Sequence, residues 1–150
     1  MLRIGGSGRT ATRLCLALAL SAGLAGACDL TTTPSQTVNL SAGRTVTSFF
    51  ATVPVGGEVF FSFTSPRDGF ISLTLLELTV NGVGLEKFVN LGLGTPVGTT
   101  CLIIDSRTIQ SGPSAQFEDI FPAGVYCVRL FDIGELTEPA LAAVNIVHPK

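Results

Sequence analysis

Apolar and polar residues alternate with a period of two in short segments along most of this 150-residue chain. Val59, Phe61 and Phe63, for example, fall on one face of an extended segment, with other residues alternating between them. A period of two is typical of a β-strand with one buried face. No amphipathic helical period persists after residue 28, so the sequence predicts an all-β protein.

Turn-forming residues separate these segments. Proline presets φ and glycine tolerates positive φ in the stretches Ser65-Pro-Arg-Asp-Gly69 and Pro122-Ala-Gly124, and Asn81-Gly82 marks another turn. The resulting short strands are expected at residues 36–40, 45–53, 58–64, 70–78, 89–94, 101–105, 115–121, 125–131 and 140–147. About eight to nine strands of this kind predict a two-layer antiparallel β-sandwich, jelly-roll-like.

Aromatic residues supply much of the predicted core. Phe49 and Phe50 are adjacent and therefore point to opposite faces of a strand, so only one of them needs to be buried. Core packing is also the interpretation for five further rings, those of Phe60, Phe61, Phe63, Phe117 and Tyr126.

The first 27 residues have the layout of a secretory signal peptide. Arg3, Arg9 and Arg13 form a basic region, and an uncharged, largely apolar run then extends to the next charge at Asp29. This run is too short to span a bilayer comfortably as a helix, and no other segment approaches the required length. The sequence therefore predicts a removed leader and no transmembrane helix.

Three small residues precede Cys28, and Leu24 stands one place further from the cysteine than is usual. This pattern resembles the lipobox of bacterial lipoproteins, in which the chain is cleaved before a cysteine that is then acylated. The resemblance implies a lipid anchor at Cys28, a polar tether over residues 28–36 and a domain over 37–150. It also implies a place on the extracytoplasmic side of the cell envelope, in either membrane. The alternative is that Cys28 simply follows an ordinary signal cleavage site.

The other cysteines suggest one disulfide. Cys15 leaves with the signal and Cys28 carries the lipid, so Cys101 and Cys127 remain as a pair in an oxidising compartment. A redox pair would have closer spacing, and a zinc site would need more ligands. A structural bridge is therefore expected.

The charge of the mature chain argues against nucleic acid. Residues 28–150 hold six Lys and Arg against eleven acids, a net charge of −5. Binding to nucleic-acid phosphates needs clustered Lys and Arg on a basic surface.

A family resemblance covers most of residues 45–148. It rests on Val59-Phe-Phe-Ser-Phe63, Gly69-Phe-Ile-Ser-Leu-Thr-Leu75 and Pro122-Ala-Gly-Val-Tyr-Cys-Val-Arg-Leu-Phe-Asp132. Together these segments resemble the bacterial pre-peptidase C-terminal domain. The resemblance implies a non-catalytic jelly-roll sandwich that assists secretion or binds matrix and polysaccharide. This chain departs from the family in having a predicted anchor rather than a protease ahead of the domain.

The sequence contains few residues that could act as catalytic groups. The only histidine, His148, lies two residues from the last residue, where we expect a solvated tail side chain rather than part of a triad. Two groups of acids could in principle work as acid and base, but we expect them to be solvated at strand ends and turns. They are Glu118 with Asp119, and Asp132 with Glu135 and Glu138.

Calcium binding is a more specific alternative role for some of these acids. Loop carboxylates could build its oxygen-rich shell, although no EF-hand spacing supports such a site. The candidate ligands are Asp105, Asp119, Asp132 and Glu135. Arg129 interrupts an otherwise apolar strand, and we expect it to face water rather than to form a buried ion pair.

The sequence therefore predicts a non-enzymatic, membrane-anchored binding or structural module without a cofactor. We expect its loops at residues 107–114 and 133–139 to contact a protein or glycan partner, because sandwich loops carry function while strands form the core. The alternative is an accessory subunit for the secretion or maturation of an exported enzyme. An enzyme is the least favoured interpretation.

Overall fold

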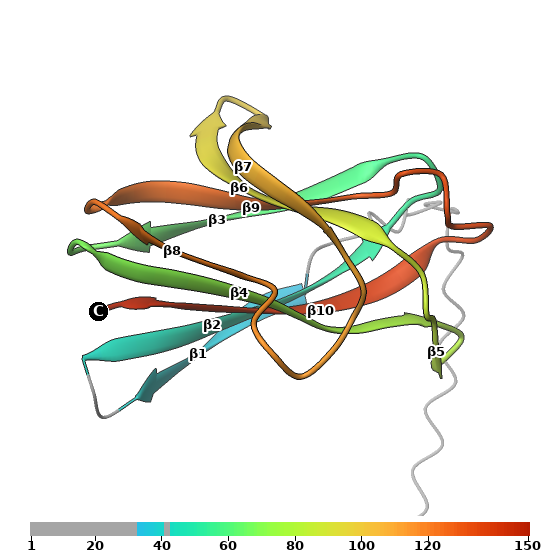
Figure 1. Cartoon of the computed structure of the whole chain (residues 1–150), viewed down its shortest axis with the longest axis horizontal. Helices are drawn as coiled ribbons and strands as arrows, with labels where there is room; N and C mark the ends of the chain where they lie inside the picture. The colour runs from blue at the N-terminus through green and yellow to red at the C-terminus, as the bar shows by residue number, and fades with distance from the viewer. Residues whose placement is uncertain (1–32, 41–42) are drawn as a thin grey trace, which may run out of the picture.

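The computed structural model describes residues 33–40 and 43–150. Within these ranges the chain forms ten β-strands and no helix (Figure 1). Accordingly, the described residues include no helix long and apolar enough to cross a membrane. The predicted signal peptide and Cys28 lie outside the described residues.

The strands form two antiparallel sheets that lie face to face (Figure 1). Sheet A contains, in spatial order, β1 (Thr33–Leu40), β2 (Arg44–Val53), β10 (Ala140–Pro149) and β4 (Gly69–Val80). Two short strands, β5 (Val83–Gly84) and β8 (Phe117–Phe121), pair with different halves of β4. Sheet B contains β3 (Glu58–Ser65), β9 (Gly124–Phe131), β6 (Val89–Val97) and β7 (Thr100–Ile109).

The pairings are nested in the manner of a jelly roll. Strand β6 pairs with β7, β4 with β8, β3 with β9, and β2 with β10. In the sequence, each of these pairs is enclosed by the next one named, and successive pairs alternate between the two sheets, as in a double Greek key. The protein is therefore an all-β, jelly-roll sandwich, as the sequence predicts, with β1 and β5 added to the eight nested strands.

The inner faces of both sheets form one hydrophobic core. Alternation along β6 buries Val89, Leu91 and Leu93 completely. The other fully buried large side chains include Phe49, Phe117, Ile71, Leu73, Leu75, Leu78, Leu130, Ile146 and Val53. Burying a side chain of this size stabilises a fold by about 1.5 to 3 kcal/mol, so this core dominates the stability of the domain.

The aromatic predictions hold except at one position. Phe63, Phe117 and Tyr126 are buried in the core, and Phe61 packs against it. Phe60 is not part of the core, because the same alternation that turns Val59 and Phe61 towards the core turns the Phe60 ring to the outer face of sheet B. Phe49 is fully buried and Phe50 is exposed, as their adjacency requires.

Several element boundaries differ from the sequence prediction, and two of the differences change the expected tether and the expected loop. Strand β1 begins at Thr33, inside the segment expected to be a tether, and a register shift before Gln36 lets it continue along β2. Strand β7 extends to Ile109, so the first three residues of the predicted loop 107–114 belong to a strand. Ile109 is buried beside Val89, which explains why the strand does not end earlier.

The predicted disulfide between Cys101 and Cys127 is present, with a Cα–Cα distance of 5.9 Å. It joins β7 to β9, although β6 lies between them in sheet B. Strands two places apart in a flat sheet lie about 9 to 10 Å apart, so β7 must leave the sheet plane to reach β9. The backbone of β7 at Leu102 and Ile103 passes close to Gly94 of β6, a position that has no side chain. A bulge at Leu93 and Gly94 marks the bend.

Candidate functional site

The carboxylate of Asp132, directly after β9, organises the loop at residues 133–139. Its Oδ1 accepts backbone N–H bonds from Gly134, Glu135 and Leu136 at 3.0, 2.9 and 3.1 Å. Its Oδ2 accepts the N–H of Gly56 at 2.7 Å from the turn between β2 and β3. The side chain is only 1% exposed, so the expectation of a solvated acid is wrong here.

Two opposing effects act on the pKa of Asp132. Burial raises this pKa because it disfavours the charged carboxylate, but the four backbone N–H donors stabilise that charge. The donors together outweigh burial, and the pKa lies below its ordinary value. Asp132 is therefore a charged structural clamp whose oxygens are already occupied.

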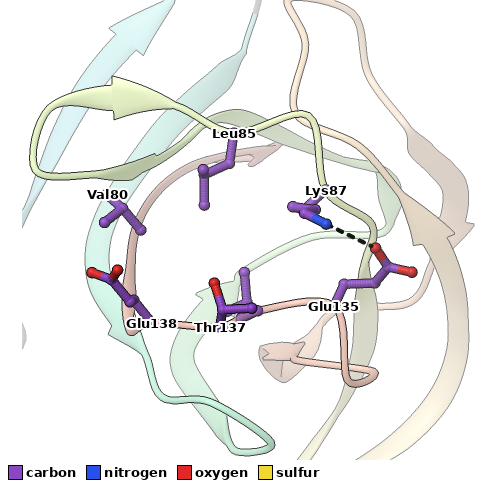
Figure 2. Close-up of a pocket in the computed structure, with 7 residues that line it drawn as sticks. Val80, Leu85, Lys87, Glu135, Thr137 and Glu138 are labelled. Atoms are coloured by element: carbon purple, nitrogen blue, oxygen red, sulfur yellow. Dashed lines mark ion pairs between the residues drawn. The ribbon is translucent and has the colours of Figure 1, made fainter.

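A pocket of about 120 Å³ opens beside the clamped loop (Figure 2). Its apolar wall combines Val80 from the end of β4 with Leu85 and the buried Leu136. Polar residues form its rim, where Lys87 and Glu135 make an ion pair at 3.6 Å. The remaining rim residues are Thr137 and Glu138. The pocket thus offers an apolar surface bordered by charges of both signs.

The segment between β5 and β6 connects both predicted contact loops. Its Lys87 pairs with Glu135 of the loop at 133–139, and its Glu86 carbonyl accepts a bond from the Gln110 side chain at 3.3 Å. Gln116 pins the other loop, since its side-chain amide bonds to both backbone groups of Leu75. Residues 110–116 are therefore held against β4, whereas the loop at 133–139 lines the pocket.

His148 is not a frayed tail residue. It lies in β10, is 5% exposed and packs against the Phe63 ring at 5.0 Å. Its Nε2 lies 3.2 Å from Thr47 Oγ1, and its Nδ1 lies 2.8 Å from the Pro149 carbonyl oxygen. Burial lowers its pKa, and the bond to Pro149 opposes this effect. The prediction of a solvated imidazole is wrong because β10 continues almost to the last residue.

The candidate calcium ligands are not gathered at one place. Asp105 lies in β7 and Asp119 in β8, and each accepts the N–H of its following residue at 2.7 Å. Asp132 is occupied by the clamp, and Glu135 pairs with Lys87. Among the described residues, no three acidic, histidine or cysteine side chains are grouped for a metal ion.

The remaining charged candidates also have structural surroundings. Arg129 forms an ion pair with Glu58 at 3.2 Å, and its side chain is 26% exposed. Arg129 therefore faces outwards from sheet B, as expected, and makes an ion pair there while its side chain is partly buried. Glu118 is exposed on β8, next to Asp119. Neighbouring strand positions point to opposite faces, so these two acids do not face one another.

Fold and site together define this chain as a jelly-roll domain with a small pocket at one end of the sandwich. No protein-family model matches it, and no curated protein sequence is significantly similar to it. Among solved structures, the chain is similar to the mitogen derived from Yersinia pseudotuberculosis. The two share 18% sequence identity over 69% of this chain and 85% of the mitogen chain, with a TM-score of 0.47.

The sequence predicted a loop at residues 133–139 but did not identify the residues from other segments that line the pocket beside it. Leu85 and Lys87 fall in a stretch with no clear periodicity. Asp132 did carry a usable signal, because Asp followed by Ile-Gly is typical of a side chain that bonds its own downstream backbone. The long-range bond to Gly56 had no such signal.

Proposed function

We propose that the protein is a membrane-anchored extracytoplasmic lipoprotein whose jelly-roll domain binds a partner at the pocket beside residues 133–139. The observation that carries the binding role is the clamped loop: four backbone bonds to Asp132 fix its first residues before any ligand arrives. A preorganised loop loses less conformational entropy on binding than a flexible one.

The chemistry of the pocket suits recognition rather than catalysis. Leu85, Leu136 and Val80 offer apolar area, while Lys87 and Glu135 largely neutralise each other. Glu138 forms no ion pair within the described residues, so it remains to attract a cationic or hydrogen-bonding group. Few convergent polar groups around an apolar wall are the usual composition of a small binding site.

The anchor rests on the sequence around Cys28. Only four residues lie between Cys28 and Thr33, the first residue of β1, so the two are five positions apart in the chain. Such a segment spans at most about 17 Å, so an acylated Cys28 would keep the domain close to the membrane surface. Several acyl chains, at about 0.8 kcal/mol per buried CH₂, would hold it there firmly.

The first experiment measures intact mass and membrane fractionation of the full chain, with and without Cys28→Ala. A mass for cleavage before Cys28 plus acyl chains, with both the lipid and the membrane association lost in the variant, supports the anchor. An unlipidated mass that is equal in both proteins would refute it.

The second experiment tests the pocket by site-specific photo-crosslinking. A photoreactive residue at Thr137, on the pocket rim, should give a discrete adduct in intact membranes, and Glu138→Arg should abolish that adduct. The same residue at Thr64, exposed on β3, is the matched control. Equal adducts from both positions, or an adduct insensitive to Glu138→Arg, would contradict a specific site.

An accessory role in secretion or maturation is our second proposal. The jelly-roll order of the strands is the arrangement that a resemblance to the pre-peptidase C-terminal domain implies, and this order supports it. Stable co-purification with an exported enzyme, and loss of that enzyme's maturation in a deletion strain, would favour this role. Unchanged enzyme secretion in the deletion strain would exclude it.

A further inference from the structure

Half of the cations in the described chain gather at the end of the sandwich opposite the pocket. Arg44 begins β2, Arg67 lies in the turn between β3 and β4, and Lys150 follows β10. The mature chain carries a net charge of −5, so a cluster of three cations at one end departs from the average surface. Asp68 is the acid beside them.

Backbone contacts fix this arrangement. The Lys150 N–H donates to the Gly43 carbonyl at 3.1 Å, and Arg67 Nε donates to the Lys150 carbonyl oxygen at 2.6 Å. Gly69 allows close approach, since a Cβ there would lie 2.8 Å from Pro149 Cγ. A shallow depression of about 300 Å³ results, lined by both arginines and Phe70.

The arginines have charge available for a ligand. Within the described residues, Arg44 forms no ion pair with a carboxylate side chain, whereas Lys87 and Arg129 both do. Arg67 pairs with no described carboxylate side chain either, but its Nε is already engaged by the main-chain oxygen of Lys150. The Asp68 carboxylate is engaged by the Ala123 N–H at 2.7 Å. The Arg44 guanidinium lies 5.8 Å from the centre of the Phe70 ring, a distance at which the aromatic face helps to orient it.

Apolar side chains border these cations. Phe70 in β4 and Ile120 in β8 are directly paired across the two strands, and they are 43% and 62% exposed. Both lie on the outer face of sheet A, where no described element covers them. The surface therefore combines guanidinium groups, which bind carboxylates in a bidentate manner, with an aromatic and an aliphatic side chain.

We propose that this basic surface, formed by Arg44, Arg67, Phe70 and Ile120, binds an acidic segment of a protein partner that also carries an aromatic or aliphatic residue. We propose an acidic segment because its carboxylates complement the positive charges of the two arginines. The Phe70 and Ile120 pair favours protein over polysaccharide, because apolar side chains gain free energy by covering it. This surface is distinct from the pocket beside residues 133–139 and does not depend on the anchor.

The position of the surface suits a partner away from the membrane. Strand β1 begins opposite Phe50 in β2 and ends opposite Arg44, so the chain enters the sandwich from the pocket end. About six strand residues, or roughly 20 Å, separate Phe50 from Arg44. With a short tether, Arg44 would thus be on the side of the domain remote from the anchor.

The test measures binding of the full chain, purified in detergent, to fluorescent polymers by anisotropy. The probe is a random copolymer of glutamate and tyrosine, compared with polyglutamate, polygalacturonate and phosphatidylglycerol vesicles. We expect the copolymer to bind most tightly, with an affinity that falls as NaCl rises from about 50 to about 200 mM. Arg44→Gln should weaken its binding about fivefold or more, since a charge pair at the centre of the contact is lost.

Two further variants complete the test. Arg107→Gln removes an equal charge from exposed β7 and should leave binding within twofold of the wild type. Ile120→Thr retains strand propensity and should abolish the preference for the copolymer over polyglutamate. No copolymer binding, an equal loss in Arg44→Gln and Arg107→Gln, tighter binding to polygalacturonate, or vesicle binding that Arg44→Gln weakens would overturn the proposal. Vesicle binding that Arg44→Gln leaves unchanged would come from the acylated Cys28 and not from this surface.

Discussion

The Asp132 carboxylate accepts the backbone N–H of Gly56 at 2.7 Å, although 76 residues separate the two in the chain. This bond joins the loop after β9 to the turn before β3. The Asp132 N–H in turn donates to the Gly57 carbonyl at 2.9 Å, so the connection runs in both directions. One buried side chain therefore holds two turns together at the pocket end of the domain.

Replacing Asp132 should lower the free energy of unfolding of the domain. It should also make that free energy depend less on pH in the acid range. In Asp132→Asn an amide NH₂ can face the Gly56 N–H, and we expect a loss of about 2 kcal/mol in the free energy of unfolding at pH 7. Because the folded pKa lies below the ordinary value of 3.8, the wild-type carboxylate stabilises the fold above pH 3.8. That contribution disappears as the pH falls through the folded pKa.

Urea unfolding at several pH values measures both effects. Asp105→Asn, at an exposed position in β7, is the matched control and should change the unfolding free energy little. Equal stabilities of Asp132→Asn and the wild type at pH 7 would show that the clamp contributes nothing.

Gly94→Ala should disturb the bend that allows the disulfide. A Cβ at this position would lie 2.1 Å from the Leu102 carbonyl oxygen, a backbone atom that cannot move without shifting β7. We expect a loss of about 1 to 3 kcal/mol and slower pairing of Cys101 with Cys127. Mass spectrometry after alkylation would count the free thiols. Gly84→Ala, where a Cβ meets no atom within 4 Å, should oxidise normally.

Removing the disulfide should lower stability by about 3.5 kcal/mol. The bridge closes a loop with a sequence separation of 26, and the chain-entropy relation gives this value for a loop of that length. The measurement compares urea midpoints of the wild type and of the double variant Cys101→Ser, Cys127→Ser. A loss below about 1 kcal/mol would mean that β7 keeps its bend without the bridge.

Local patterns in the sequence were sufficient to predict the fold. Alternation places Leu91 and Leu93 inside, and the turn stretches set most strand boundaries within a few residues. The disulfide was predicted by assigning Cys15 to the signal peptide and Cys28 to the lipid anchor, which left Cys101 and Cys127 as a pair. Phe60 shows that residue type alone does not predict burial. Its aromatic ring lies on the outer face of the sheet because of its position in the strand alternation.

The site needed information that the local sequence does not contain. Segments far away in the chain supply partners for two buried groups: the turn between β2 and β3 for Asp132, and β2 for His148. Lys87 reaches Glu135 only after the jelly roll has brought β6 beside β9. Single acids and histidines are usually placed at the surface. That rule fails where long-range backbone donors or ring contacts offset the desolvation cost of burying them.

Asp105 and Asp119 should protect the sheets against edge-to-edge association. In the described chain β7 ends sheet B and β8 pairs only with β4, so both are edge strands. Each Asp side chain accepts a hydrogen bond from the N–H of the next residue. That N–H is then not available to pair with a strand of another molecule. We expect Asp105→Val with Asp119→Val to aggregate faster at equal stability, by light scattering. Asn at both positions keeps an acceptor and should remain monodisperse.

His148 should make the domain less stable in mild acid. Its folded pKa lies below 6.5, so below that pH the unfolded chain binds the proton more readily than the folded chain does. Stability is therefore complete above pH 6.5 and declines as the pH falls from 6.5 towards the folded pKa. His148→Gln keeps a polar group near Thr47 but cannot be protonated, and its stability should stay level over this interval. Urea unfolding from pH 7 to pH 5 gives the slopes, and NMR titration of the sole histidine gives the folded pKa directly. Parallel slopes for the two proteins would show that the buried imidazole is not responsible for the acid sensitivity.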